Sequence, residues 1–81
     1  MYYVYILISV KDGNFYIGST GDLHRRMSEH NLGKVESTKH RQPLTLICYE
    51  AYSSKSIAHR RELFLKSSDG RKDLRRRFKL G

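Results

Sequence analysis

The sequence predicts an α+β domain in the order ββαβα plus a short C-terminal helix, a three-stranded, mainly antiparallel sheet flanked by helices. Two runs rich in aromatic and β-branched residues open the chain and are joined by a turn signal. Two later segments begin with residues that cap helices, and a third apolar run lies between them. A chain of 81 residues is short, so we expect a single domain, residues 1–81, with a small core.

The first two strands are predicted at residues 2–10 and 15–19, with Asp12-Gly13 as a two-residue hairpin turn between them. In that register Lys11 pairs with Asn14 and Ser9 pairs with Tyr16. Side chains alternate along a strand, so Tyr16 would share a face with Tyr5. Both tyrosines would then point toward one site.

Asp22 is a good N-cap for a helix from Leu23 to about Asn31. Arg26 and His30 are four residues apart, so they share a face of that helix. Residues 34–43 are expected to form a basic loop.

Residues 44–52 are predicted to be a third, central strand. Ser53 or Ser54 caps a second helix that runs to about Lys66. On it Ala58, Glu62 and Leu65 fall on one stripe, an unusual place for a carboxylate. The segment "SSDGRKD" interrupts the pattern, and Leu74, Phe78 and Leu80 suggest a short final helix.

The net charge is +8, and most of it lies in the C-terminal third. Residues 1–54 hold six Lys/Arg and five Asp/Glu, whereas residues 55–81 hold ten and three. A polyanion is therefore the expected partner, the alternative being a merely solubilising surface. An anionic membrane is disfavoured because the tail has few large apolar residues.

Cys48 is the single cysteine, so an internal disulfide or a cysteine-based zinc site is excluded. We expect it to be a buried, inert thiol. The chain has no apolar run long enough to span a bilayer, and "MYYVYILISV" reads as a strand and not as a signal peptide. A cytoplasmic location is expected.

Several residues together resemble the GIY-YIG nuclease family. The first motif corresponds to Tyr3-Val4-Tyr5, with tyrosine in place of the usual glycine, and the second to Tyr16-Ile17-Gly18. Downstream, "GSTGDLHRRMSEHN" resembles the family's first helix, and "AHRRELFLK" its glutamate-bearing helix. The close, "LKSSDGRKDLRRRF", resembles that of small stand-alone members. The resemblance covers nearly the whole chain.

This resemblance implies metal-assisted hydrolysis of phosphodiester bonds. Tyr5 would act as general base or orient the attacking water, and Tyr16 would position the water or the phosphate. Arg26 would bind that phosphate, and His30 would support proton transfer or contact the phosphate. Glu62 would be the protein ligand of one Mg²⁺ or Mn²⁺, an ion that often takes one or two carboxylates. Glu62 could instead pair with Lys66 on the helix surface.

DNA is expected as the partner more than RNA, in repair, recombination or the processing of foreign DNA. The basic residues expected to bind it are Lys39, Arg41, Lys66, Arg71, Arg75 and Arg76. Many family nucleases carry an asparagine after the metal glutamate, but Asn14 and Asn31 both precede Glu62. The alternative is a nucleic-acid-binding module of the same fold with weak or absent catalysis.

Overall fold

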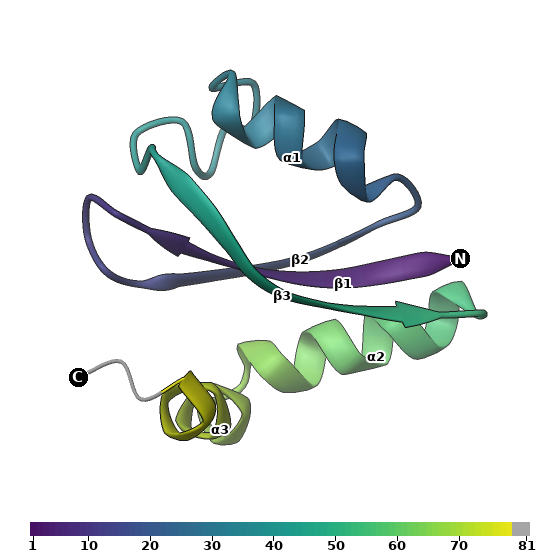
Figure 1. The fold of residues 1–81 in the computed structure, drawn as a ribbon. Helices are drawn as coiled ribbons and strands as arrows, with labels where there is room; N and C mark the ends of the chain where they lie inside the picture. The colour runs from purple at the N-terminus through teal and green to yellow at the C-terminus, as the bar shows by residue number, and fades with distance from the viewer. Residues whose placement is uncertain (79–81) are drawn as a thin grey trace.

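The computed structural model describes residues 1–78, and Leu80 of the predicted final helix lies outside this range. The elements are three strands, β1 (Tyr2–Ser9), β2 (Phe15–Thr20) and β3 (Leu44–Tyr52), and three helices, α1 (Leu23–Asn31), α2 (Lys55–Lys66) and α3 (Ser68–Phe78). The α+β class and the three-stranded antiparallel sheet are confirmed. Helix α1 covers one face of the sheet, and α2 and α3 cover the other (Figure 1).

The strand order is β2-β1-β3, so β1 is central and the prediction of a central β3 is wrong. The exposure pattern gives the reason. Val4 and Ile6 are buried on one face of β1 while Tyr5 and Leu7 are buried on the other. In β3 alternate residues such as Tyr49 remain exposed, as expected of an edge strand.

The β1–β2 hairpin is wider than predicted. Leu7 pairs with Tyr16, and the Ser9 amide donates to the Asn14 carbonyl at 3.0 Å, so residues 10–13 form the loop. The Asp12 carboxylate accepts the Asn14 amide at 2.9 Å, and Gly13 takes a positive φ of 73°. The register differs from the predicted one by two residues, and an even shift keeps every side chain on its face.

Local capping signals place the first two helices correctly. The Asp22 side chain accepts the Arg25 amide, and the Ser54 side chain accepts the Ile57 amide. Each bond satisfies an amide that has no partner within its helix.

The interruption after α2 is present but is confined to Ser67, and α3 begins at Ser68, so the prediction that it extends over residues 67–73 is wrong. Gly70 does not break this helix. A Cβ there would lie 2.1 Å from the Phe64 carbonyl oxygen and 2.5 Å from the Leu65 Cα. Glycine at this position lets α3 pack directly against the end of α2.

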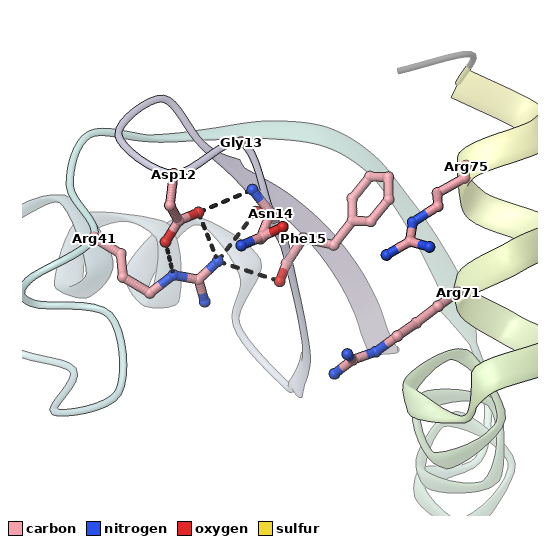
Figure 2. Close-up of a pocket in the computed structure, with 7 residues that line it drawn as sticks. All are labelled: Asp12, Gly13, Asn14, Phe15, Arg41, Arg71 and Arg75. Carbon is pink, nitrogen blue, oxygen red and sulfur yellow. Dashed lines mark hydrogen bonds and ion pairs between the residues drawn. The ribbon is translucent and has the colours of Figure 1, made fainter. Parts of the chain in front are cut away.

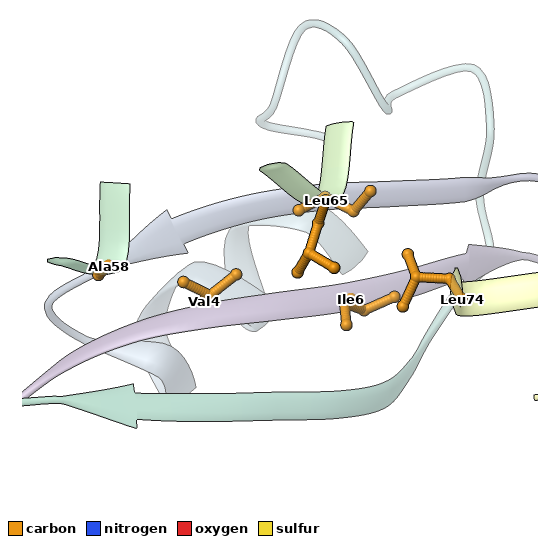
Figure 3. Close-up of a cluster of buried hydrophobic side chains, with 6 residues drawn as sticks. Val4, Ile6, Ala58, Leu65 and Leu74 are labelled. Atoms are coloured by element: carbon orange, nitrogen blue, oxygen red, sulfur yellow. The ribbon is translucent and has the colours of Figure 1, made fainter. Parts of the chain in front are cut away.

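The main core lies between the sheet and helices α2 and α3. Figure 3 shows Val4 and Ile6 of β1 facing Ala58, Leu65 and Leu74. The four larger of these side chains are fully buried, and each such burial contributes about 1.5–3 kcal/mol. A second cluster, built on Tyr5, Leu7 and Leu44, packs beneath α1. Cys48 is only partly buried against the main core, contrary to expectation. Within residues 1–78, every helix is too short and too polar to cross a membrane.

Candidate active site

Tyr5 lies directly across the sheet from Gly18, its partner in the β1–β2 ladder. The tyrosine ring covers the glycine so closely that a Cβ at position 18 would be 2.4 Å from the Tyr5 hydroxyl oxygen. Gly18 therefore ends the second motif because a side chain there would occupy the space of the tyrosine.

A buried hydrogen-bonded chain runs from Tyr5 into the core beneath α1. The Tyr5 hydroxyl lies 2.9 Å from His30 Nε2, and His30 Nδ1 lies 2.8 Å from Thr38 Oγ1. All three residues are at most 1% exposed. The Arg26 guanidinium beside Tyr5 can only donate, so we assign the Tyr5 proton to the bond with His30 Nε2. Nδ1 then donates to Thr38.

Burial sets the protonation states of this chain. Desolvation raises the pKa of Tyr5, with Arg26 opposing it and the nearby Tyr16 and Glu62 adding to it. Desolvation also lowers the pKa of His30, helped by the positive charge of Arg26. At neutral pH the tyrosine is therefore protonated and the histidine is a neutral acceptor. The net effect of the protein's own groups is to raise the pKa of Tyr5, whereas a general base would require a lowered pKa.

Tyr16 completes the aromatic cluster and reaches further toward solvent. Its ring packs edge-on against His30 at a centroid distance of 5.1 Å and lies 6.4 Å from the Tyr5 ring. The Tyr16 hydroxyl accepts a hydrogen bond from Ser37 at 3.3 Å. The two tyrosines thus meet at one place, as their shared face predicted.

Arg26 borders an open cleft beside this cluster. Its side chain is 37% exposed, and Nη1 donates to Glu29 at 3.1 Å. The cleft has a volume of about 440 Å³ and also presents Ser19, Thr20 and Arg25. An arginine in such a position can reach an anion from solvent, whereas the buried His30 cannot contact a phosphate directly in this conformation.

Glu62 approaches from the other face of the sheet. The Ser19 hydroxyl donates to Oε1 at 2.6 Å, and the Lys66 ammonium donates to Oε2 at 2.7 Å. The side chain is 12% exposed. Desolvation alone would raise the pKa of Glu62, but the bonds from Lys66 and Ser19 outweigh it and lower the pKa. The carboxylate is therefore ionised at neutral pH. The ion pair between Glu62 and Lys66, which the sequence offered as an alternative to metal binding, is present.

Ser19 joins the two halves of the site. It lies next to Gly18 on β2, binds Glu62, and borders the cleft that holds Arg26. Strand β2 is an edge strand, so this meeting point lies at the border of the sheet.

The donor set fits a hard cation held by one protein ligand. Within residues 1–78 there is no group of three or more His, Cys, Asp or Glu side chains that could enclose a metal. Mg²⁺ requires no such cage, because it retains several waters and is often held by one or two carboxylates plus substrate phosphate. Glu62, which is ionised and 12% exposed, would serve in this way if a cation displaced the Lys66 ammonium.

The predicted basic residues differ in their availability. Lys39 pairs with Glu36 at 3.1 Å, and Arg41 is held by Asp12 at 2.8 Å with its side chain 25% exposed. Arg41 therefore stabilises the hairpin loop first of all. Arg71 and Arg75 project from α3 toward that loop (Figure 2), and Arg76 is exposed on the same helix.

Sequence reasoning missed the residues that hold the site together. Thr38 supports His30 from the loop before β3, Ser19 supports Glu62, and Glu29 holds Arg26. The position of Ser19 directly after the second motif was an available signal. Thr38 lies eight residues from His30 in an irregular loop, where no periodicity could reveal the contact.

Comparison with known proteins places this fold in the GIY-YIG nuclease family. The GIY-YIG catalytic-domain model matches residues 1–79, and the chain belongs to this family. Members generally use divalent metal ions and act on nucleic acid, generally DNA.

The chain is similar to small UPF0213 proteins. It is 45% identical to one from Halobacterium salinarum over 82% of this chain and 86% of the relative. It is 43% identical to one from Staphylococcus haemolyticus, over 82% and 80% of the two chains. The solution NMR structure of a UPF0213 protein from Bacillus halodurans matches 91% of this chain and 82% of that chain, at 40% identity and a TM-score of 0.56.

Proposed function

We propose that this protein is a divalent-metal-dependent endonuclease that hydrolyses phosphodiester bonds in DNA. The observation that carries the proposal is the convergence at Gly18 and Ser19. Tyr5 and His30 lie on one side of these residues, Glu62 lies on the other, and Arg26 borders the adjoining cleft. Three kinds of group therefore border Gly18 and Ser19: the proton acceptor His30, the anion-binding Arg26 and the carboxylate of Glu62.

Each residue takes a role that its surroundings allow. Arg26 binds the scissile phosphate, since its planar guanidinium can donate two parallel hydrogen bonds to phosphate oxygens. Tyr16, whose hydroxyl is the less buried of the two, contacts the attacking water. His30 holds Tyr5 in place through Nε2 and can accept its proton, because the histidine is neutral and anchored by Thr38.

Glu62 is the proposed protein ligand of one Mg²⁺ or Mn²⁺. When bound, such an ion offsets the negative charge that develops on phosphate oxygens and supplies nearby positive charge. Ser19 donates to Oε1 and Lys66 to Oε2, so a cation at Glu62 would compete with Lys66 for the carboxylate. Lys66 also keeps the carboxylate ionised when the cation is away.

A second candidate is a nucleic-acid-binding module, favoured by one observation. The ion pair with Lys66 already neutralises Glu62, and a binder would need no more from that carboxylate. Repair, recombination or the processing of foreign DNA are settings consistent with either candidate. The cytoplasmic location and the single-domain organisation stay predictions.

Incubation with a panel of nucleic acids separates the two candidates. Supercoiled, linear duplex, branched and single-stranded DNA, together with RNA, are incubated with Mg²⁺, Mn²⁺ or EDTA. We expect cleavage of DNA with either metal and none with EDTA. Binding to these substrates without cleavage of any of them would favour the module.

A further inference from the structure

A basic cavity, separate from the cleft beside Arg26, lies between the β1–β2 hairpin loop and α3. It has a volume of about 370 Å³ and is lined by Asp12, Gly13, Asn14, Phe15, Arg41, Arg71 and Arg75. Figure 2 shows the two α3 arginines reaching toward Phe15 and the loop from the opposite wall. The family's site residues discussed above are not part of it.

The acidic group in this cavity is already neutralised. Both oxygens of Asp12 accept hydrogen bonds from Arg41, at 2.8 and 3.3 Å. Arg41 also donates to the backbone carbonyls of Asn14 and Phe15, at 3.1 and 3.3 Å. These bonds fix the loop and engage the Asp12 carboxylate away from α3.

Arg71 and Arg75 keep their charges free. They are four residues apart, so they lie one above the other on the same face of α3. Within residues 1–78, neither forms an ion pair or a side-chain hydrogen bond, and Asp73 of the same helix faces Arg77 at 3.9 Å. With Asp12 and Arg41 cancelling, the cavity carries a surplus of two positive charges.

The cavity lies on the same side of the sheet as Glu62. Phe15 and Ser19 both point to the α2–α3 face of edge strand β2, since they are four residues apart and strand side chains alternate. At about 3.3 Å per residue, the two positions are separated by roughly 13 Å. Along a duplex axis this equals about four nucleotides of one strand, at about 3.4 Å each.

We propose that this cavity binds a backbone phosphate of the nucleic acid, about four nucleotides from the phosphate at the candidate active site. The arginine pair supplies charge-assisted hydrogen bonds, and Asn14 supplies a neutral amide at the rim. Such a contact fixes the direction in which the strand crosses the sheet edge without reading its sequence. The proposal rests on the proposed function in taking nucleic acid as the ligand.

The test compares two charge-matched double variants in EDTA, where cleavage is not required. Arg71→Gln/Arg75→Gln removes the cavity charges, and Lys34→Gln/Arg60→Gln removes two exposed charges elsewhere. Affinity for a labelled DNA duplex is measured by fluorescence anisotropy over a salt series. We expect the cavity variant to make the log K versus log salt slope shallower by about 0.9, the contribution of the one phosphate contact that it loses. Equal changes in both variants would overturn the proposal.

Amide chemical shifts locate the contact and identify the source of the phosphate. Duplex DNA should shift the amides of Gly13, Asn14 and Phe15 in the wild type and leave them unchanged in the cavity variant. Inorganic phosphate is titrated separately against chloride at matched ionic strength. If inorganic phosphate shifts these amides and DNA does not, the cavity is a site for small phosphates and the proposal is wrong. If DNA shifts these hairpin amides but is not cleaved, the result counts against the proposed nuclease activity and not against the phosphate site.

Discussion

Gly18→Ala tests the close contact between β2 and the Tyr5 hydroxyl. The new Cβ would lie 2.4 Å from the hydroxyl oxygen and 2.6 Å from Cζ, both too short for any real contact. Tyr5 is 1% exposed and bonded to His30, so the ring has no free space into which it can move. We therefore expect the variant to displace the tyrosine and to break the bond with His30.

The size of the effect follows from two terms. Overpacking a core site costs about 1–3 kcal/mol, and leaving a buried polar group unpaired costs a further 1–3 kcal/mol or so. The expected loss is about 2–6 kcal/mol, a large part of the stability of about 4–12 kcal/mol usual for this chain length. Gly21→Ala is the matched control, because a Cβ there meets nothing within 4 Å.

Urea unfolding followed by far-ultraviolet circular dichroism measures the loss, since the chain has no tryptophan. In a Tyr5→Phe background the hydrogen bond is already absent, so Gly18→Ala should cost about 1–3 kcal/mol less there. Equal midpoints for Gly18→Ala and Gly21→Ala would refute the packing argument. An unfolded Gly18→Ala protein beside a folded Gly18→Ala/Tyr5→Phe protein would support it.

Three further predictions concern the buried chain and the charged surface. Thr38→Val keeps the shape but leaves His30 Nδ1 without its partner, so unfolding free energy should fall by about 1–3 kcal/mol, whereas exposed Thr45→Val should change it by less than about 0.5. Burial lowers the pKa of His30 in the folded state, so the unfolded chain binds a proton at higher pH than the folded protein does. The urea midpoint should therefore fall as pH drops below about 6.5. A His30→Gln variant should lack the part of this pH dependence that His30 causes. DNA affinity should fall with salt at a log–log slope of about −4 to −5 if four to six phosphates are neutralised, and a slope near zero would remove the electrostatic account of the basic C-terminal third.

Local signals in the sequence were enough to predict the first two helices and the shared face of the tyrosines. Asp22 and Ser54 cap the starts of their helices by accepting the amide three residues further on. These bonds are local and need no partner from a distant segment. The turn was predicted wrongly, but the prediction that Tyr5 and Tyr16 share a face is correct. The register error is two residues, and an even shift leaves each side chain on the same face.

The misplaced features depend on partners that are distant in sequence. Strand order is set by which strand buries both faces, so the apolar run at residues 44–52 could not reveal that β3 lies at an edge. Gly70 resembles a helix breaker locally, yet its function is to admit the backbone of α2. Asp12 and Arg41 meet across 29 residues, so the sequence could not reveal that Arg41 anchors the hairpin loop.

Cleavage by Glu62→Gln, measured beside DNA binding, tests the proposed nuclease most directly. The substitution keeps the hydrogen bond from Ser19 possible and removes the charge proposed to hold the cation. We predict that Mg²⁺-dependent cleavage falls by at least about 10²-fold while duplex binding persists, and that Glu36→Gln, an exposed loop control, cleaves like the wild type. Tyr5→Phe removes the hydroxyl whose proton His30 can accept, so cleavage should fall by about 10²–10⁴-fold, the range of a lost acid–base group, with binding intact. Wild-type cleavage that survives both Glu62→Gln and EDTA would contradict the metal-dependent mechanism.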